Sequence, residues 1–175
     1  MIPTKPPLFT IDLSRCIGCK ACSVACKDRA RLPDDLDWLR VEAHEGGVYP
    51  APTLVYRVVH CYHCANPACV HSCPTGAMEQ GAEGWVQVDA ELCIACGACI
   101  AACPFGAVVM GAEGAACKCD GCLDERARGW DPTCVRACPM RALGAGGAAE
   151  KAGRVTDETF DDHGIGPSVV YWQRV

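Results

Sequence analysis

Four groups of four cysteines constrain this chain more than any other feature of its sequence. The first and third groups have the spacing C-x2-C-x2-C-x3-C, the second has C-x2-C-x4-C-x3-C, and the fourth has a longer loop between its second and third cysteines. The groups are Cys16, Cys19, Cys22, Cys26; Cys61, Cys64, Cys69, Cys73; Cys93, Cys96, Cys99, Cys103; and Cys119, Cys122, Cys134, Cys138. This repetition predicts four similar sites and leaves Cys117 outside them.

Disulfides, zinc ions and iron–sulfur clusters could each use this many cysteines. Disulfides are typical of exported chains, but residues 1–13 show neither a signal-peptide pattern nor a twin-arginine pattern. Zinc sites use paired C-x2-C elements, whereas two of these groups place three cysteines at two-residue intervals. Three groups also end in Cys-Pro, which has no role at a zinc site. We therefore expect thiolate ligands of iron–sulfur clusters.

The run C-x2-C-x2-C-x3-C-P is the bacterial ferredoxin signature, in which the fourth cysteine binds the other cluster of a two-cluster unit. Groups two and three are neighbours in sequence and are expected to form one unit, which leaves groups one and four for a second. The predicted ligand sets are Cys16, Cys19, Cys22 with Cys138; Cys119, Cys122, Cys134 with Cys26; Cys61, Cys64, Cys69 with Cys103; and Cys93, Cys96, Cys99 with Cys73.

The predicted fold class is α+β, with two ferredoxin-like units that each hold two clusters. The outer unit is predicted to comprise residues 1–52 and 111–150, and the inner unit, residues 53–110, is inserted into it. Residues 151–175 are predicted to form a C-terminal tail that contacts a partner. With 18 glycines, 12 prolines and 6% aromatic residues, the chain is expected to be loop-rich and to depend on its clusters for stability.

Local patterns predict a few short elements between the cysteine groups. Strands are expected at Leu8–Asp12, Thr53–Val59 and Trp85–Val88, short helices at Ser23–Ala30 and Leu123–Arg128, and a flexible connector at 144–153. Residues Pro167–Trp172 are expected to be either a terminal strand or an extended segment on a partner. The uncharged stretch Leu92–Ala112 has the length of a membrane span, but its cysteines, glycines and Pro104 favour packing around a cluster.

From about Phe9 to Leu143, the sequence resembles the iron–sulfur subunit of the dimethyl sulfoxide reductase family. The motifs that carry the resemblance are IDLSRCIGCKACSVACKD, CYHCANPACVHSCPTGAM, VDAELCIACGACIAACPFGA and KCDGCLDERARGWDPTCVRACPMRAL. The resemblance implies four 4Fe–4S clusters, because Cys96 stands where some relatives have a tryptophan and a three-iron cluster. It also implies an order in which the Cys16 cluster lies nearest a catalytic subunit, followed by the Cys119 and Cys61 clusters, with the Cys93 cluster farthest away.

The resemblance further implies partners. Members of the family dock on a catalytic subunit with a molybdenum or tungsten pterin cofactor, and often on a membrane subunit that handles quinol. A stand-alone polyferredoxin or a hydrogenase-linked electron adaptor is the alternative. We expect no membrane span and no signal in this chain, which would be cytoplasmic, membrane-associated or exported in folded form with a partner that carries a twin-arginine signal.

The sequence excludes two broad classes of function. It contains no Ser-His-Asp grouping, phosphate loop or dinucleotide fingerprint, so we expect electron transfer without a catalytic site. A net charge of −5 without a basic stripe argues against nucleic-acid binding.

Several other residues lie beside the predicted ligands. His63 and His71 are expected to hydrogen-bond near a cluster rather than to bind iron, and Cys117 is expected to be a bystander, with its use in place of Cys119 as the alternative. Six cations flank ligands and would either raise cluster potentials or be solvated surface charges; they are Lys20, Lys27, Lys118, Arg126, Arg136 and Arg141.

Overall fold

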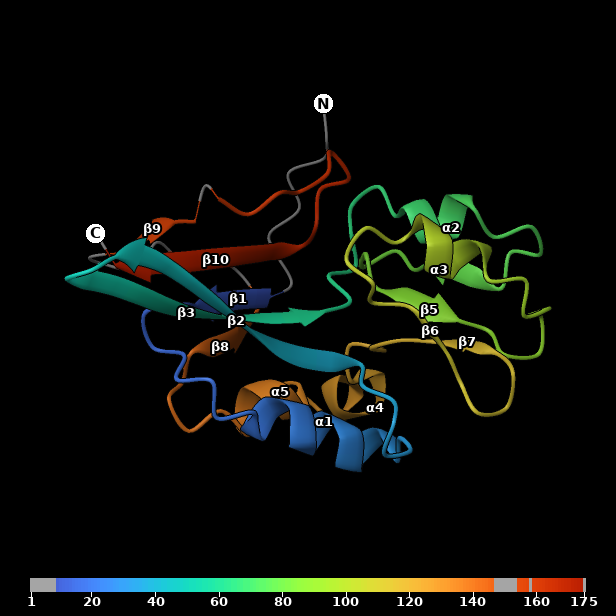
Figure 1. The fold of residues 1–175 in the computed structure, drawn as a ribbon. Coiled ribbons are helices and arrows are strands. Elements are labelled where there is room, and N and C mark those ends of the chain that lie inside the picture. The colour runs from blue at the N-terminus through green and yellow to red at the C-terminus, as the bar shows by residue number, and fades with distance from the viewer. Residues whose placement is uncertain (1–8, 147–153, 158, 175) are drawn as a thin grey trace.

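The computed structural model describes residues 9–146, 154–157 and 159–174, which form two lobes side by side (Figure 1). Segments from both ends of the sequence build the outer lobe, and the middle part of the sequence builds the inner lobe. The outer lobe contains β1 (Phe9–Asp12), α1 (Ala21–Ala30), β2 (Leu39–Val48), β3 (Ala51–His60), α4 (Leu123–Ala127), α5 (Thr133–Arg136), β8 (Leu143–Ala145), β9 (Arg154–Thr156) and β10 (Val169–Arg174). The inner lobe contains α2 (Ala68–His71), β4 (Met78–Gln80), β5 (Val86–Val88), α3 (Ala98–Ala102), β6 (Val109–Met110) and β7 (Ala116–Cys117).

A four-stranded sheet with the order β8-β1-β10-β9 organises the outer lobe. Strand β1 runs parallel to β10, with Phe9 opposite Val169, and antiparallel to β8, with Phe9 opposite Ala145. All four residues of β1 are buried, as expected for a strand with a neighbour on each side. Of the two alternatives for Pro167–Trp172, the structure has the terminal strand, so the C-terminal segment belongs to the sheet; its contact with a partner stays a prediction.

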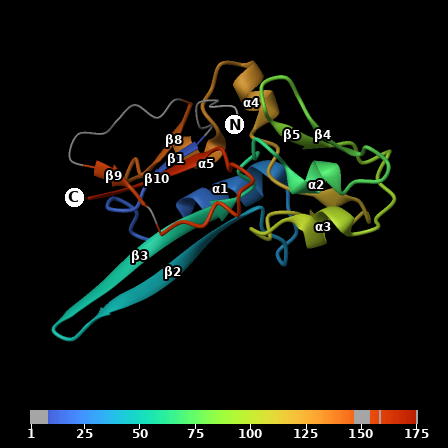
Figure 2. The same ribbon diagram turned by 90° about the horizontal axis from the view of Figure 1, so that it is seen from above.

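Strands β2 and β3 form a long hairpin that projects away from both lobes (Figure 2). Leu39 pairs with His60 at its base, where Val58 and Val59 are buried. At its tip, Val48 and Tyr49 are 80% and 95% exposed. The sequence predicted only the Thr53–Val59 part of this hairpin.

The inner lobe has no large sheet among its described residues, only two hairpins and two short helices. Met78 pairs with Val88 across β4 and β5, and Val109 pairs with Cys117 across β6 and β7. Helix α2 packs on α3, and a small core of Met78, Val86, Val108 and Ala116 surrounds Cys69 and Cys99. Hairpin β6–β7 joins the two sides of the predicted boundary between residues 110 and 111.

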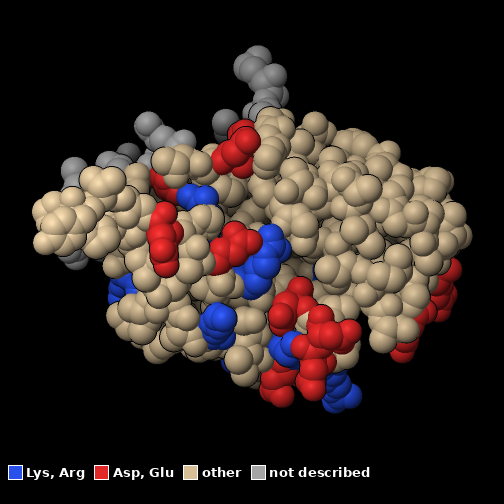
Figure 3. All heavy atoms as spheres, in the orientation of Figure 1, with Lys and Arg blue, Asp and Glu red and all other residues tan. Residues whose placement is uncertain are grey.

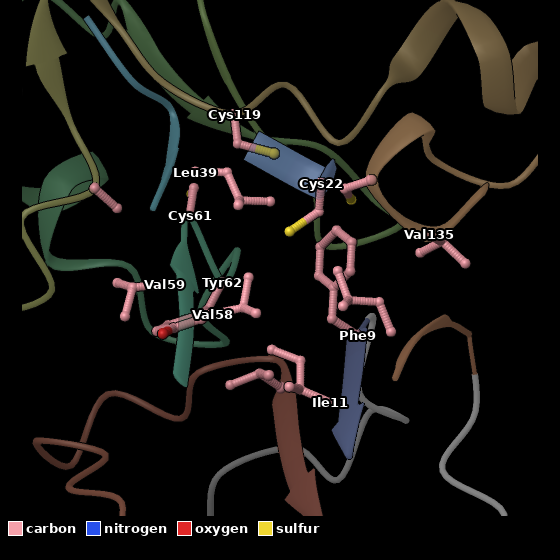
Figure 4. Close-up of a cluster of buried hydrophobic side chains, with 14 of the residues drawn as sticks. Phe9, Ile11, Cys22, Leu39, Val58, Val59, Cys61, Tyr62, Cys119 and Val135 are labelled. Atoms are coloured by element: carbon pink, nitrogen blue, oxygen red, sulfur yellow. The ribbon is translucent and has the colours of Figure 1, made fainter. Parts of the chain in front are cut away.

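The larger core lies where the outer lobe meets the start of the inner one (Figure 4). It contains Phe9, Ile11, Val58 and Tyr62, and the close-up shows the cysteines of three groups among these side chains, namely Cys22, Cys61 and Cys119. Cysteine side chains of three groups are therefore part of the core packing.

The predicted strands correspond to β1, β3 and β5, and the predicted helices to α1 and α4. The predicted connector 144–153 differs at its start, because residues 144–145 belong to β8, while residues 147–153 lie outside the described residues. Within the described ranges, no helix is long and apolar enough to cross a membrane. The uncharged stretch Leu92–Ala112 contains the short helix α3 and the two-residue strand β6.

Candidate metal centres

The third cysteine of every group is the second residue of a short helix. These four cysteines are Cys22 in α1, Cys69 in α2, Cys99 in α3 and Cys134 in α5, and all four are buried. The fourth cysteine follows four residues later, where side chains on a helix would share one face. Helices α2, α3 and α5 end before that cysteine, so the backbone can direct it elsewhere.

A second shared feature is a left-handed residue immediately before the second cysteine of each group. These residues are Gly18, His63, Ala95 and Gly121, with φ values of 68°, 48°, 57° and 67°. The left-handed turn reverses the backbone, and it recurs at the same place in every C-x2-C pair. Glycine adopts it freely, whereas His63 and Ala95 hold it at a cost of about 1–2 kcal/mol. Motif spacing predicted the loops but not this strain.

Two cavities are lined by four cysteines each, and each lining includes a cysteine from a second group. One cavity is lined by Cys61, Cys64, Cys69 and Cys103, with apolar side chains around them. The other cavity is lined by Cys16, Cys19, Cys22 and Cys138. In both places the structure brings together the residues of one predicted ligand set.

Charge interactions between thiols link the cysteines of the other two sets. Burial raises the pKa of Cys119 well above its usual value, and charges on Cys26 and Cys134 act in the same direction. Cys122 and Cys26 have the same effect on the pKa of Cys134, so Cys26 lies with the fourth group. Burial also raises the pKa of Cys99, with smaller contributions from Cys73 and Cys93. Cys73 therefore lies with the third group.

The chemistry of these donor sets suits a cationic iron–sulfur core. Burial raises the pKa of Cys22 to about 11 and those of Cys26 and Cys64 to about 12, so without metal these thiols keep their protons at neutral pH. Bound metal removes such protons and offsets the repulsion between thiolates. All seventeen cysteines are free thiols. In the described ranges no three His, Cys, Asp or Glu side chains converge around a single metal ion.

Backbone N–H groups point at one sulfur in each set. Ala107 donates to Cys103 Sγ at 3.5 Å, and Ala142 donates to Cys138 Sγ at 3.3 Å. Both donors lie four residues after a cysteine of a Cys-Pro pair, so the turn after that pair returns an N–H to the sulfur. Gly121 and Ala116 supply the corresponding donors at 3.4 Å to Cys119 and Cys93. Hydrogen bonds to sulfur tune cluster potentials, and because they come from the backbone no side-chain motif predicts them.

The four sets differ in exposure. All four cysteines of the Cys119 set are buried, and only Cys103 of the Cys61 set is half-buried. The Cys16 and Cys93 sets each contain an exposed cysteine, Cys19 and Cys96 respectively, and the neighbouring Ile17 and Ile94 are 55% and 62% exposed. Two sets thus reach the surface through apolar loops, and two are enclosed.

Contacts between sets follow one linear order. The charge of Cys22 acts on Cys134, and the charge of Cys61 acts on Cys119. Cysteines of the Cys61 and Cys93 sets share the core of the inner lobe. The sequence of neighbours is therefore the Cys16, Cys119, Cys61 and Cys93 sets, with the exposed sets at the two ends.

Three other residues singled out by sequence, His63, His71 and Cys117, each have at least one hydrogen-bond partner. His63 Nδ1 accepts a hydrogen bond from the Val86 N–H at 3.0 Å, and its ring packs on Trp85. His71 Nε2 lies 2.8 Å from Asn66 Oδ1 at the surface. Cys117 Sγ accepts a hydrogen bond from Trp38 Nε1 at 3.3 Å, in β7 rather than in a cysteine-lined cavity.

Comparison with known protein families gives two matches, both described as 4Fe–4S dicluster domains. One covers residues 53–147 and the other covers residues 15–77. Two dicluster domains imply four 4Fe–4S clusters, as the sequence predicted, and the short helices and strands fit the predicted α+β class.

Curated proteins similar to this one are electron-transfer or B subunits of reductases. The B subunit of anaerobic dimethyl sulfoxide reductase from Escherichia coli (strain K12) is 42% identical over 147 residues, which cover 79% of this protein and 72% of the relative. Thiosulfate reductase electron transfer subunit PhsB of Salmonella typhi is 40% identical over 93% of this protein and 83% of its own length. The B subunit of polysulfide reductase from Wolinella succinogenes is 38% identical over 82% of this protein and 78% of its own length.

Proposed function

Because this protein belongs to the iron–sulfur subunits of the dimethyl sulfoxide reductase family, we propose that it conducts electrons through a reductase complex. It would connect a catalytic subunit with a molybdenum or tungsten pterin cofactor to a quinol-linked membrane subunit or another redox partner. When bound, 4Fe–4S clusters supply one-electron transfer. The protein supplies their ligands, insulation and docking surfaces, and has no catalytic site of its own.

Each cluster is held by three cysteines of one group and one of another. The sets are Cys16, Cys19, Cys22, Cys138; Cys119, Cys122, Cys134, Cys26; Cys61, Cys64, Cys69, Cys103; and Cys93, Cys96, Cys99, Cys73. The observation that carries this proposal is the composition of the two cysteine-lined cavities, because each contains the exchanged cysteine, Cys103 or Cys138. The same exchange makes the inner unit an insertion within the outer one.

The four clusters form a linear array, and its two end sets, the Cys16 set and the Cys93 set, serve as the contacts with partner proteins. Cys19 and Cys96 are exposed, and each lies in a loop that also contains an exposed isoleucine. An exposed apolar patch beside a cluster-binding site suits a protein interface. The Cys16 end would face the catalytic subunit, and the Cys93 end would face the membrane subunit or another redox partner. The compartment follows from the partner, since a catalytic subunit with a twin-arginine signal would carry this protein across the membrane already folded.

Purification of the tagged protein from its native host tests the proposal. We expect a large pterin-containing subunit to copurify, together with about 16 irons and 16 sulfides per copy of this subunit, as four cubanes require. A hydrogenase in place of the pterin subunit would support the adaptor alternative. A protein that stays alone, or that contains zinc instead of iron, would contradict the proposal.

Substitutions at the two exposed end sets test which of them faces the pterin subunit. Ile17→Asp is expected to reduce recovery of the pterin subunit at least tenfold, because it places a charge in the apolar patch next to Cys19. Ile94→Asp is the matched variant at the other end and should leave that recovery unchanged. The opposite pattern would reverse the orientation.

A further inference from the structure

Lys118 is a buried lysine at the junction of the two lobes. It is 3% exposed, and its ammonium donates hydrogen bonds to two backbone carbonyls. One belongs to Val86 in β5 of the inner lobe, and the other belongs to Cys119 in the outer lobe, at 3.1 Å. Its position therefore ties the two lobes together at a predicted iron ligand.

Carbonyl oxygens alone are poor compensation for a buried ammonium. Removal of such an ion from water costs several kcal/mol unless an opposite charge is nearby. No carboxylate of the described residues forms an ion pair with Lys118. The negative charge that compensates it must come from another source.

The cysteine sets on either side of Lys118 supply that charge when they bind iron. Cys119 is adjacent to Lys118 in the sequence, and its set is entirely buried. On the other side, burial raises the pKa of Cys69 to about 11, and the Lys118 ammonium acts in the opposite direction. The Cys119 and Cys61 thiols also interact with each other. Lys118 thus lies between the two central sets.

The composition of the inner lobe makes this cation unusual. Residues 61–117 contain Asp and Glu residues but no Lys or Arg. The inner lobe therefore has two negatively charged cluster sites and no lysine or arginine of its own. Lys118 is the first such residue after this segment, and it donates back to β5.

We propose that Lys118 is the shared counter-ion of the two central clusters and raises the reduction potentials of both. Reduction adds one electron, and so one negative charge, to a cluster, and a fixed cation nearby stabilises the reduced form more than the oxidised form. The Lys118 charge lies between the Cys119 and Cys61 sets, which belong to different lobes. It therefore stabilises an electron on either of these two clusters. The inference rests on the ligand sets of the proposed function.

EPR-monitored redox titration of the iron-loaded protein tests this role. In Lys118→Met, the ratio of reduced to oxidised cluster at a given potential should fall about tenfold for the two central clusters, which is about 59 mV for a one-electron couple. The two end clusters should change by less than about threefold. Lys118→Gln should give the same result, because it retains a hydrogen-bond donor without the charge.

Lys27→Met is the matched control. Lys27 also follows a predicted ligand, Cys26, but its ammonium pairs with Asp37 at 3.2 Å and its side chain is 26% exposed. Solvent and the carboxylate already screen that charge, so no cluster should change by more than about threefold.

Three outcomes would overturn the proposal: unchanged central clusters in Lys118→Met, parental behaviour in Lys118→Gln, or equal shifts in all four clusters. If both neutral variants lose iron, Lys118→Arg becomes decisive. Iron retained by the arginine variant supports a charge requirement, whereas iron lost from all three variants assigns Lys118 to packing and overturns the proposal. A parent protein with fewer than four clusters would instead contradict the proposed function.

Discussion

The two lobes carry similar cysteine sets but are stabilised in different ways. The outer lobe has a four-stranded sheet and ion pairs between distant segments, such as Arg29 with Asp120 and Arg57 with Asp157. The inner lobe has two separate hairpins, a small core and no lysine or arginine between 61 and 117. Figure 3 shows the same contrast on one face, where charged side chains gather beside α1 and α4 and most of the inner lobe is uncharged.

This difference indicates that the stability of the inner lobe relies more on its clusters than the stability of the outer lobe does. An isolated two-stranded hairpin is marginal in water, and a small domain with few apolar residues needs another source of stability. We therefore expect the folding of the inner lobe to depend on iron binding. In the outer lobe, packing of β1 between β8 and β10 provides stability that does not require metal.

Iron removal should give the largest difference in stability between the two lobes. After chelation under reducing conditions, amides of 61–117 should lose their protection against hydrogen exchange, while those of β1, β8 and β10 should keep part of theirs. Hydrogen-exchange mass spectrometry of chelated and untreated protein measures this directly. Equal loss in both lobes would show that they fold as one unit and would end the comparison.

The exchanged cysteines provide the next largest effect. Cys26→Ser should remove the Cys119 cluster rather than the Cys16 cluster, and Cys73→Ser should remove the Cys93 cluster, each with a loss of roughly four irons. Cys117→Ser is the control and should retain all iron, because Cys117 contacts Trp38. EPR spectra and iron analysis report which cluster is lost. If Cys26→Ser affected only the Cys16 cluster, the nested ligand sets would be wrong.

The Arg57–Asp157 pair tests the stability specific to the outer lobe. Its nitrogen and oxygen lie 2.6 Å apart, and the two side chains are 19% and 3% exposed. Arg57→Ala should reduce the free energy of unfolding by about 3 kcal/mol, since it leaves a buried carboxylate without its cation. Asp37→Ala, at an exposed pair with Lys27, should change it by less than about 1 kcal/mol. Denaturant titration measures both, and equal effects would contradict the assignment.

The same pair has a defined pH dependence. Burial alone would raise the pKa of Asp157, but hydrogen bonds from Thr159 and Arg57 outweigh it and hold this pKa below the usual 3.8. Because the folded-state pKa is the lower one, the stabilisation is fully present above about pH 4 and is lost as the pH falls through the folded-state pKa. The stability difference between Arg57→Ala and the parent should therefore shrink only in that acidic range.

Two left-handed glycines offer the finest comparison. An added Cβ at Gly121 in the outer lobe would lie 2.3 Å from the Trp85 ring, whereas at Gly76 in the inner lobe it would meet nothing within 4 Å. Gly76→Ala should cost about 1 kcal/mol from backbone strain alone. Gly121→Ala should cost about 2 kcal/mol more, because Trp85 must move. Similar losses in denaturant titrations would show that the ring yields easily.

Motif spacing was sufficient for the family and for the 4Fe–4S cofactors, because three cysteines in one tight loop have few other uses. Local strand patterns between the cysteine groups located β1, β3 and β5. They missed β2, although Leu39 to His44 alternates apolar and polar residues as a half-buried strand does. The parallel pairing of β1 with β10 joins residues far apart in sequence, and no local pattern encodes it.

Burial was the other quantity that sequence could not provide. Lys27 and Lys118 look alike as cations beside cysteines, yet one pairs with a carboxylate near solvent and the other is enclosed between lobes. The left-handed conformation of Ala95 likewise depends on the loop that contains it, not on a preference of alanine. Such features follow from tertiary packing, which overrides what a residue type would do alone.

The position of β1 has a consequence for biosynthesis. Strand β1 leaves the ribosome well before its neighbours β8 and β10, which begin only at Leu143 and Val169. Until those neighbours are synthesised, both edges of β1 lack their partners, and an unpaired strand edge is prone to aggregation. The strands of the inner lobe can meet earlier, because its hairpins pair residues close in sequence. We therefore expect the local hairpins of the inner lobe to pair before the sheet around β1 is complete.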